Sequence, residues 1–292
     1  LDRIDPLERQ TDMSYKHIRY EVADKIARIT ANRPRYRNAQ STIMMEEMDD
    51  AFKEANFDPD VRVITMFGEG DHFSAGHDLG TPEETEYRKS EYLIQEGVRG
   101  RYNHTREQFV DKTMRWRNVQ KPTIAGVQGY CIFGGWIIAS AMDIVFAAED
   151  AMFLPVNFQY FSVPWDIHPR KVKEILFEGR FIDAAEAHEL GFVNRVVSRD
   201  RLEAEVMDYA AKVAKNDPFQ MRMTKNAVNG MQDAQGFHQH ISSAHAMFLL
   251  SSQGEKDPDF AVDIPDGRRR PMVQRALENY REKRDKDGNR KG

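Results

Sequence analysis

The chain of 292 residues contains one cysteine, Cys131, so it cannot form a disulfide bond within itself. It also lacks any run of roughly 18 apolar residues, the length that a membrane-spanning helix requires, and we expect no membrane association. Its first residues are charged and do not include the apolar segment of a secretory leader. These absences together predict a protein of the reducing cytoplasm.

Basic charge is concentrated near the C-terminal end. The formal net charge is −5, yet residues 267–292 carry ten Lys or Arg against four Asp or Glu. Such a tail is most often a solvated helix end, although it could also bind a phosphate group. No platform of interleaved aromatic and basic residues accompanies it, so we expect no nucleic-acid partner.

Three histidines, His238, His240 and His245, invite comparison with a metal site. Their spacings of two and five residues do not bring all three onto one helical face. We therefore expect no bound metal.

Strand-like and helix-like patterns alternate over the first two thirds of the chain. Alternating or continuous apolar runs predict strands over residues 18–22, 26–30, 61–67, 123–127, 144–146 and 193–197. Ser41 precedes a helical pattern that continues to Asn56, and Asp183 precedes a shorter one that ends at Gly191. This alternation predicts an α/β fold with parallel strands.

The remaining segments are mostly helical in pattern. Residues 81–118 are polar and partly helical, and we expect them at the surface over the loop that precedes them. Further helices are predicted over residues 200–215, 218–230 and 236–251. A linker rich in Pro, Gly and Asp over residues 257–267 then precedes a basic helix that contains Tyr280.

Two glycine-rich turns each follow a predicted buried strand, over residues 68–80 and 129–135. Reactions of a thioester develop negative charge on the carbonyl oxygen, as an enolate or a tetrahedral oxyanion. Two backbone N–H groups, one of them at a helix N-terminus, stabilise such a charge. Either turn alone is a weak signal, because glycine turns after strands are common, but the order and spacing of the two are more specific.

Several motifs in order resemble those of the crotonase (enoyl-CoA hydratase/isomerase) superfamily. The motifs are Asn32-Arg33-Pro34 with Arg37-Asn38-Ala39, Phe73-Ser74-Ala75-Gly76-His77-Asp78-Leu79, residues 121–130 from Lys121 to Tyr130, Asp143-Ile144 with residues 153–164, and residues 181–194 from Phe181 to Asn194. The likeness extends over residues 17–290.

The resemblance implies a crotonase (ClpP-like) spiral of ββα units with a helical C-terminal region that mediates trimerisation. On this basis we expect an N-terminal extension over residues 1–16, the spiral core over 17–198, the helical trimerisation region over 199–265, and a basic C-terminal helix or tail over 266–292. The resemblance further implies a homo-trimer or hexamer.

The resemblance also assigns residues to an acyl-CoA substrate. The backbone N–H groups of His77 and Gly134 would form the oxyanion hole. The CoA moiety would be bound by residues from the first two motifs: Ala75, Asp78 and Leu79 along the adenine and pantetheine path, and Arg35 and Arg37 near the phosphates, with the basic C-terminal helix able to reach a phosphate as well. Coenzyme A would enter as part of the substrate, without a separate cofactor.

The sequence departs from a hydratase of this family at both positions that carry its catalytic glutamates. These positions hold Ile137 and Asn157. An isoleucine cannot transfer a proton, and a neutral amide is a poor acid or base at pH 7. Phe133 replaces a glycine beside Gly134 and is expected to narrow the pocket. A non-hydratase reaction that depends on the oxyanion hole is therefore predicted.

Other side chains could replace the missing glutamates. Asp166 or His168 could act as base or nucleophile, although Asp166 could equally cap a helix that begins near Pro169. Tyr160 could donate to an oxyanion or simply pack in the core, and His77 could turn its imidazole into the pocket. Asp78 would more often stabilise its own loop.

Three functions stay open at this point. The first is an acyl-CoA-processing enzyme that resembles enoyl-CoA hydratase/isomerase. The second is a thioester or carbon–carbon hydrolase that uses Asp166 or His168. The third is a catalytically inactive acyl-CoA-binding protein.

Overall fold

The computed structural model describes residues 15–92, 94–155, 158–254 and 271–289. A six-stranded sheet with the order β1-β2-β3-β4-β6-β9 forms its centre. Its strands are β1 (Ile18–Ala23), β2 (Ile26–Ala31), β3 (Val63–Gly68), β4 (Thr123–Val127), β6 (Ile144–Ala148) and β9 (Arg195–Val197). The β1–β2 hairpin is antiparallel and the other neighbours pair in parallel, which confirms the predicted α/β arrangement.

A second, three-stranded sheet stands beside the first. It has the order β5-β7-β8 and consists of β5 (Tyr130–Ile132), β7 (Met152–Leu154) and β8 (Ile182–Asp183). β5 and β7 are parallel, whereas β7 and β8 are antiparallel. Because β5 follows β4 after only two residues, the chain turns from one sheet into the other at Gly129. Its φ of +54° is a left-handed conformation that glycine adopts readily.

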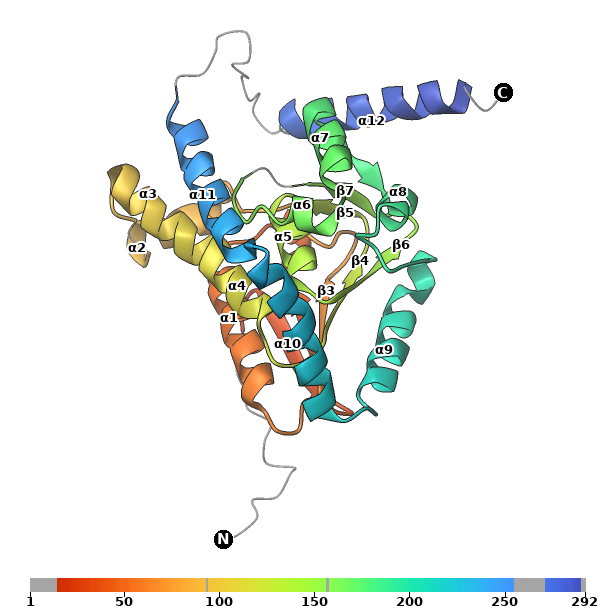
Figure 1. Cartoon of the computed structure of the whole chain (residues 1–292). Helices are drawn as coiled ribbons and strands as arrows, with labels where there is room; N and C mark the ends of the chain where they lie inside the picture. Colours follow the sequence, from red (N-terminus) through yellow and green to blue (C-terminus); the bar gives the residue numbers. More distant parts are fainter. Residues whose placement is uncertain (1–14, 93, 156–157, 255–270, 290–292) are drawn as a thin grey trace.

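Helices surround both sheets (Figure 1). The α-helices are α1 (Thr42–Phe57), α2 (Pro82–Ser90), α3 (Gly97–Thr105), α4 (Lys112–Arg117), α5 (Gly134–Ala141), α6 (Val163–Asp166), α7 (Pro169–Glu178), α8 (Ala184–Glu189), α9 (Leu202–Val213), α10 (Pro218–Ala234), α11 (Phe237–Gln253) and α12 (Pro271–Asn289). Two 3₁₀ turns, η2 (Pro34–Tyr36) and η4 (Arg199–Arg201), and one π-helical segment, η3 (Arg106–Asp111), complete the set.

The predicted caps of two helices are confirmed. Ser41 Oγ accepts a hydrogen bond from Met44 N at 3.1 Å at the start of α1. Asp183 Oδ1 accepts one from Glu186 N at 2.9 Å at the start of α8. Each side chain satisfies an N–H group that the first helical turn leaves without a partner.

The inner strands β3 and β4 are buried throughout, and alternate residues of each strand point to opposite faces of the sheet. Val63 and Phe67 of β3 pack with Leu202, Val206 and Ala210 of α9. The residues between them, including Ile64 and Met66, join the larger core that includes α1, α4 and α5. Thus α9, which begins the region predicted to be helical, packs directly on the sheet.

The segment over residues 81–118 is only partly at the surface. Most of α2 is exposed. In α4, by contrast, Trp116 is fully buried and stacks on Phe52 of α1 with ring centroids 5.4 Å apart. The surface prediction was therefore wrong for α4, because its indole completes the core beside α1.

The last helices lie at two separate places in Figure 1. α10 and α11 run beside α4 and η3, whereas α12 lies at the opposite side, next to α7. Ala276, Leu277 and Tyr280 of α12 pack against the second sheet, and Tyr280 Oη donates to Asp183 Oδ2 at 2.8 Å. The linker predicted over residues 257–267 lies outside the described residues.

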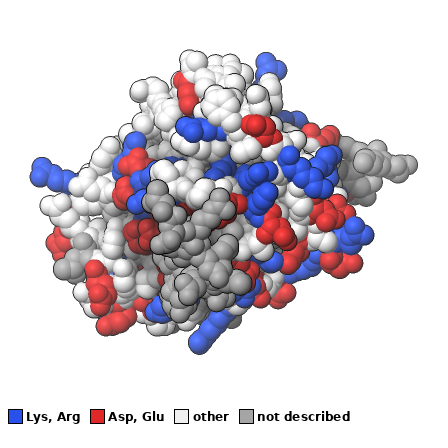
Figure 2. Space-filling model, turned by 90° about the horizontal axis from the view of Figure 1, so that it is seen from below, with Lys and Arg blue, Asp and Glu red and all other residues white. Residues whose placement is uncertain are grey.

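On the face shown in Figure 2, acidic and basic side chains are interspersed among uncharged ones. Within the part of the chain that the structure describes, no helix combines the length and apolar character needed to cross a membrane.

Candidate active site

Three chain segments lie side by side where β2, β3 and β4 end. Parallel bridges join Gln40 to His77 and Ser74 to Cys131. Residues 74–77 therefore form the middle segment, with the segment of Gln40 on one side and that of Cys131 on the other. Ser74 N donates to Tyr130 O at 2.9 Å, and Ile132 N donates to Ser74 O at 3.0 Å. Buried Asn38 reinforces the stack, because its Nδ2 donates to the backbone oxygens of Glu69 and His72.

This stacking fixes the direction of the His77 backbone amide. Gln40 N donates to Gly76 O at 2.8 Å, and Asp78 N donates to Gln40 O at 2.9 Å. The residues on either side of His77 therefore bond toward Gln40, and the N–H of His77 itself points to the opposite edge. That edge faces the segment that leads into α5.

Glycines allow the close approach at this point. Gly76 has a φ of +90°, and a Cβ atom there would lie 2.8 Å from Ile132 O and 3.4 Å from Gly134 N. A Cβ on Gly134 would lie 2.4 Å from Gln40 Oε1 and 2.9 Å from His77 Nδ1. Gly76 consequently requires glycine, whereas a larger residue at position 134 would force the Gln40 and His77 side chains to shift. The backbone of residue 76 comes next to the N-terminus of α5.

The amides of His77 and Gly134 are both available. Among the described residues, neither N–H donates a hydrogen bond. Gly134 is the first residue of α5, where the helix dipole adds partial positive charge. Two free N–H groups on adjacent segments, one of them at a helix N-terminus, are the arrangement that stabilises an oxyanion.

The imidazole of His77 lies directly beside these amides. Its Nε2 is 2.9 Å from Gln159 Oε1, and its ring stacks on Phe109 with centroids 3.8 Å apart. Burial, together with the smaller effect of the positive charge of Arg88, lowers the pKa of His77 to about 4. The ring is therefore neutral at pH 7, and with Nε2 donating to Gln159, the buried Nδ1 carries the lone pair and has no partner among the described residues.

A cavity of about 540 Å³ opens beside His77. Its lining includes His77, Leu79, Arg88, His104, Phe109 and Gln159. Phe109 belongs to the π-helical segment η3, and such segments are frequent at functional sites. The extra residue in that turn accompanies the placement of the Phe109 ring on the His77 imidazole.

The structure brings part of the predicted CoA-binding set to this region. Leu79 is 64% exposed and lines the cavity. Ala75 N donates to Arg37 O at 2.9 Å, which ties the exposed Arg37 to the loop that carries His77. Exposed Arg35 lies near the Tyr36 ring, with its guanidinium carbon 5.5 Å from the ring centroid.

Asp78 is buried and stabilises its own loop. Its carboxylate pairs with Arg33 at 2.9 Å and accepts hydrogen bonds from Gly80 N, Thr81 N and Thr81 Oγ1. These bonds hold the pKa of Asp78 below its usual value in spite of burial. The carboxylate therefore stabilises the conformation of its own loop, which is one of the two roles that the sequence analysis considered for Asp78; the other was a contact with CoA.

The three positions that depart from a hydratase differ in what the structure describes. Ile137 is buried in the core, 1% exposed, and Asn157 lies outside the described residues. Phe133 adopts a φ of +45°, and its ring packs with the cluster of Leu154, Phe181 and the apolar side of α12. It does not line the cavity beside His77, so the expectation that it narrows this pocket was wrong.

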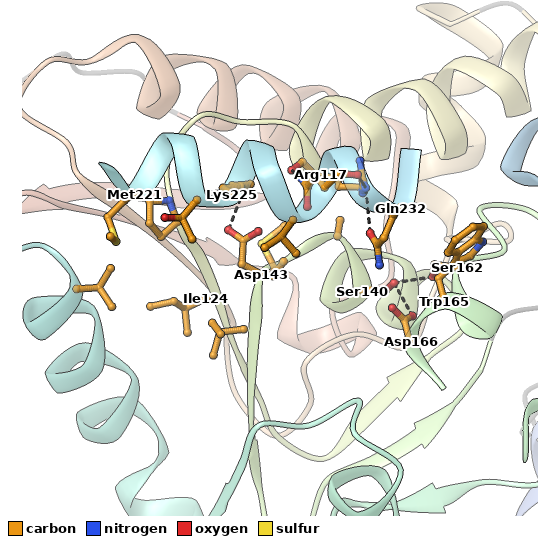
Figure 3. Close-up of a pocket in the computed structure, with 18 of the residues that line it drawn as sticks. Arg117, Ile124, Ser140, Asp143, Ser162, Trp165, Asp166, Met221, Lys225 and Gln232 are labelled. Atoms are coloured by element: carbon orange, nitrogen blue, oxygen red, sulfur yellow. Dashed lines mark hydrogen bonds and ion pairs between the residues drawn. The ribbon is translucent and has the colours of Figure 1, made fainter. Parts of the chain in front are cut away.

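Asp166 lies in a different cavity, of about 530 Å³, between the core and α10 (Figure 3). Ser140 Oγ donates to Asp166 Oδ2 at 2.7 Å, and Trp136 Nε1 donates to the same oxygen at 3.3 Å. Ser140 is near the C-terminal end of α5, whereas Gly134 begins that helix. The structure therefore does not bring Asp166 to the two free amides.

The environment of Asp166 nevertheless perturbs its ionisation. Burial raises its pKa to about 7, and the hydrogen bonds from Ser140, Ser162 and Trp136 limit the rise. The side chain is still partly accessible, and its accessible part faces the cavity. The alternative interpretation, that Asp166 caps the helix beginning at Pro169, was wrong: it ends the short helix α6 instead.

His168 and Tyr160 also lie apart from the amides. His168 is exposed and caps α7, with Nδ1 accepting from Arg170 N at 3.4 Å. Tyr160 is fully buried against Phe237, and burial raises its pKa. Its hydroxyl has no hydrogen-bond partner among the described residues.

The three C-terminal histidines make separate contacts. His238 pairs with Asp233, His240 accepts from Trp165 Nε1 at 2.9 Å, and His245 contacts Thr105 Oγ1 at 2.8 Å. Across the described ranges, no group of three or more His, Cys, Asp or Glu side chains is placed to hold a metal ion.

The residues of the His77 cavity that sequence reasoning missed include Arg88, His104, Phe109 and Gln159. They come from α2, α3, η3 and the segment before α6, and no local motif connects them. Sequence position gave a partial indication, because three of the four lie in the polar segment, residues 81–118, that was predicted to cover the glycine-rich loop.

The chain matches the model of the enoyl-CoA hydratase/isomerase family over residues 21–258. A curated relative from Mycobacterium tuberculosis, named "Putative enoyl-CoA hydratase EchA13", is 35% identical over 276 residues, which cover 85% of this chain and 87% of the relative.

Solved structures give the same result. A "probable enoyl-CoA hydratase" from Mycobacterium thermoresistibile is 41% identical, with a TM-score of 0.73 over 81% of this chain and 96% of that chain. An "enoyl-CoA hydratase/isomerase" from Xanthobacter autotrophicus Py2 is 35% identical, with a TM-score of 0.75 over 84% and 90%. The chain belongs to the enoyl-CoA hydratase/isomerase family and has the crotonase fold, which confirms the resemblance.

Proposed function

We propose that this enzyme binds an acyl-CoA thioester and stabilises the enolate of that thioester with the backbone N–H groups of His77 and Gly134. The observation that carries the proposal is a pair of amides on adjacent segments, one at the N-terminus of α5, for which the described residues provide no acceptor. Because these donors are held in place before substrate arrives, they can stabilise developing charge without rearrangement of the loops.

The proposed reaction is a proton transfer at the carbon next to the thioester, and not hydration. Addition of water needs an acid and a base, and Ile137 at one of the two family positions can supply neither. Migration of a proton needs one group that can accept the proton and return it. A non-hydratase reaction of this kind fits the side chains that surround the amides.

His77 is the side chain proposed to carry the proton. Its neutral imidazole lies beside Gly134, and Nδ1 is left to accept while Gln159 holds Nε2. Proton transfer to Nδ1 forms an imidazolium next to the enolate, and the two opposite charges stabilise each other in a water-poor site. Asp166 and His168 are not favoured, because neither lines this cavity.

The CoA moiety is proposed to lie along Ala75 and Leu79, with its phosphates near Arg35 and Arg37 or the basic side of α12. The exposed positions of both arginines support this, because a phosphate needs accessible cations. A homo-trimer or hexamer in the cytoplasm remains part of the proposal by family likeness.

The test is deuterium exchange. A panel of acyl-CoA thioesters is incubated with the protein in deuterated water, and mass spectrometry records the gain of deuterium and any released CoA. We expect exchange next to the thioester carbonyl with at least one thioester. The His77→Gln variant should lose about 10²–10⁴ in exchange rate while binding CoA as before, since general acid–base groups contribute that much.

Two outcomes would replace the proposal by one of the alternatives. Release of free CoA without exchange would point to thioester hydrolysis. Binding of CoA thioesters without any change in mass would point to an inactive acyl-CoA-binding protein.

A further inference from the structure

Arg88 is held firmly at the wall of the His77 cavity. Its Nε donates to Glu84 Oε1 at 2.5 Å, and Glu84 is almost fully buried. The same carboxylate accepts from Thr42 N at 2.9 Å and from Thr42 Oγ1 at 2.6 Å. Glu84 is thus fixed by the start of α1, and it fixes the Arg88 side chain in turn.

Among the described residues, the outer part of the Arg88 guanidinium has no hydrogen-bonding partner. In the described part of the chain, its bonds use only Nε, so the two terminal nitrogens remain free to donate. A guanidinium presents these nitrogens as a planar fork that matches a carboxylate. Arg88 also lines the cavity, and its side chain is about one third exposed.

Two imidazoles lie in the same cavity as Arg88. His104 joins His77 in the lining, and both rings have a buried Nδ1 without a partner among the described residues. Burial, together with the smaller effects of the positive charges of Arg88 and Lys112, lowers the pKa of His104 to about 4. Both imidazoles are therefore neutral, and the positive charges in the lining come from Arg88 and Arg101.

An aliphatic acyl chain does not suit this wall. It would exclude water from Arg88 and from the two imidazoles while offering them no hydrogen bond, which costs free energy for each buried polar group. The apolar part of the lining, with Leu79 and Phe109, lies beside polar side chains rather than forming a continuous apolar tunnel.

We propose that the acyl group of the substrate is short and ends in a carboxylate, which the terminal nitrogens of Arg88 bind in the His77 cavity. The proposal rests on the proposed function, because it assigns the acyl end of an acyl-CoA to this cavity. Arg101, at the exposed rim, adds a second positive charge, and Glu96 adds one negative charge there. Asp78 also lines the cavity, but it is neutralised by Arg33.

The test compares matched CoA thioesters that differ only at the end of the acyl group. Malonyl-, succinyl- and glutaryl-CoA are paired with propionyl-, butyryl- and pentanoyl-CoA, and calorimetry gives each affinity. We expect one of the carboxylate thioesters to bind about 10–100-fold more tightly than its partner, as one charge-assisted hydrogen-bonding group contributes. Equal affinities within all three pairs, or a preference for the aliphatic thioesters, would overturn the proposal without any variant.

Variants then locate the effect. Arg88→Gln should abolish the preference and leave the affinity for CoA itself unchanged. Lys89→Gln is the matched control, because it removes one positive charge from an exposed position of the same helix and should keep the preference. Arg88→Lys keeps the charge without the fork and should retain a smaller preference.

Two results would count against Arg88 and one against the whole assignment. A preference that survives Arg88→Gln would exclude Arg88 as the ligand. An equal loss for CoA and for all thioesters would mean that Arg88 binds a CoA phosphate. Failure of the wild-type protein to bind CoA at all would reject the proposed function, which is a different result from binding without a preference.

Discussion

The molecule has two cavities of similar size, and each contains a buried ionisable side chain with a shifted pKa. The cavity of about 540 Å³ contains His77, and the cavity of about 530 Å³ contains Asp166. Burial is the largest cause of the shift in both, and it favours the neutral form in both. Judged by ionisation alone, either could be the active site.

The surroundings separate the two cavities. The His77 cavity lies beside the backbone N–H groups of His77 and Gly134, which meet no acceptor in the described ranges. The carboxylate of Asp166 instead meets the hydroxyl of Ser140 and the indole of Trp136. In Figure 3, Asp166 lies at one end of its cavity, and the ion pair of Asp143 with Lys225 lies farther along it. A shifted pKa marks a candidate, and unbonded donors aimed at a developing charge decide between candidates.

The largest expected difference between the cavities is in turnover. His77→Gln should lower the rate of deuterium exchange by about 10²–10⁴, since it removes the group that carries the proton. Asp166→Asn keeps the shape of its own cavity and should change the rate by less than about threefold, because a distant neutral substitution alters no general acid or base. A large loss in Asp166→Asn at unchanged melting temperature would reverse the assignment.

The next effect concerns the glycine at the start of α5. Gly134→Ala places a methyl group 2.4 Å from Gln40 Oε1 and 2.9 Å from His77 Nδ1, so the imidazole must move. We expect a loss of stability of about 1–3 kcal/mol from overpacking, together with loss of exchange activity.

The control for this change is Gly230→Ala in α10, where a Cβ meets no atom within 4 Å. Alanine in an open helix interior should raise stability by about 0.5–1 kcal/mol and leave activity unchanged. Thermal melts and exchange rates of the two variants check both statements. Full activity in Gly134→Ala would contradict the close packing of Gly134 against Gln40 and His77.

Local sequence patterns were enough to predict the framework of the site. β4 was predicted with its exact bounds, and Ser41 and Asp183 were recognised as caps, because strand periodicity and capping depend on neighbouring residues. The oxyanion amides remain a prediction from the motifs, now with a geometry that supports it.

The side chains around those amides could not be predicted in the same way. Gln159 reaches His77 across 82 positions in the sequence, and Phe109 reaches it through a π-helical turn that no periodicity indicates. Asp166 stood out because of its chemistry and its neighbours in sequence. Tertiary packing decides which end of α5 the Asp166 side chain faces, and the residues next to Asp166 in the sequence do not indicate that packing.

The ionisation of Asp166 predicts a pH dependence of stability. Its pKa is about 7 in the folded protein and about 3.9 in an unfolded chain. The folded state therefore binds the proton more tightly, and stability falls as pH rises from about 4 to 7. Because the side chain is partly exposed, we expect about 2 kcal/mol and not the full value of the shift.

Asp166→Asn should remove this dependence. Relative to wild type, the variant should become more stable as pH rises from 4.5 to 7.5, and thermal melts at several pH values give the difference. A constant difference over that range would show that the carboxyl group is solvated.

His77 predicts the opposite slope. Its folded pKa of about 4 lies below the value of about 6.5 in an unfolded chain, so the unfolded state binds the proton more tightly. The contribution of His77 to stability is complete above about pH 6.5 and is lost as the pH falls toward 4. We expect about 1 kcal/mol from this residue after allowance for its partial exposure. Thermal melts should show that His77→Gln loses less stability than the wild type between pH 7 and pH 4.5. An equal loss in both would mean that the His77 ring is solvated in the folded protein.

The smallest effect is expected outside both cavities, at His168. Its exposed imidazole caps α7 through a long contact of 3.4 Å with Arg170 N, so it contributes little to the first turn. His168→Ala should cost no more than about 0.5 kcal/mol, and His168→Ser should be neutral or slightly stabilising, because serine is the better cap. Neither change should alter exchange activity, since the side chain meets neither cavity. Melting temperatures and exchange rates of the two variants are the measurement. Loss of activity in both variants at wild-type stability would mean that His168 takes part in the reaction, and that the site extends beyond the His77 cavity.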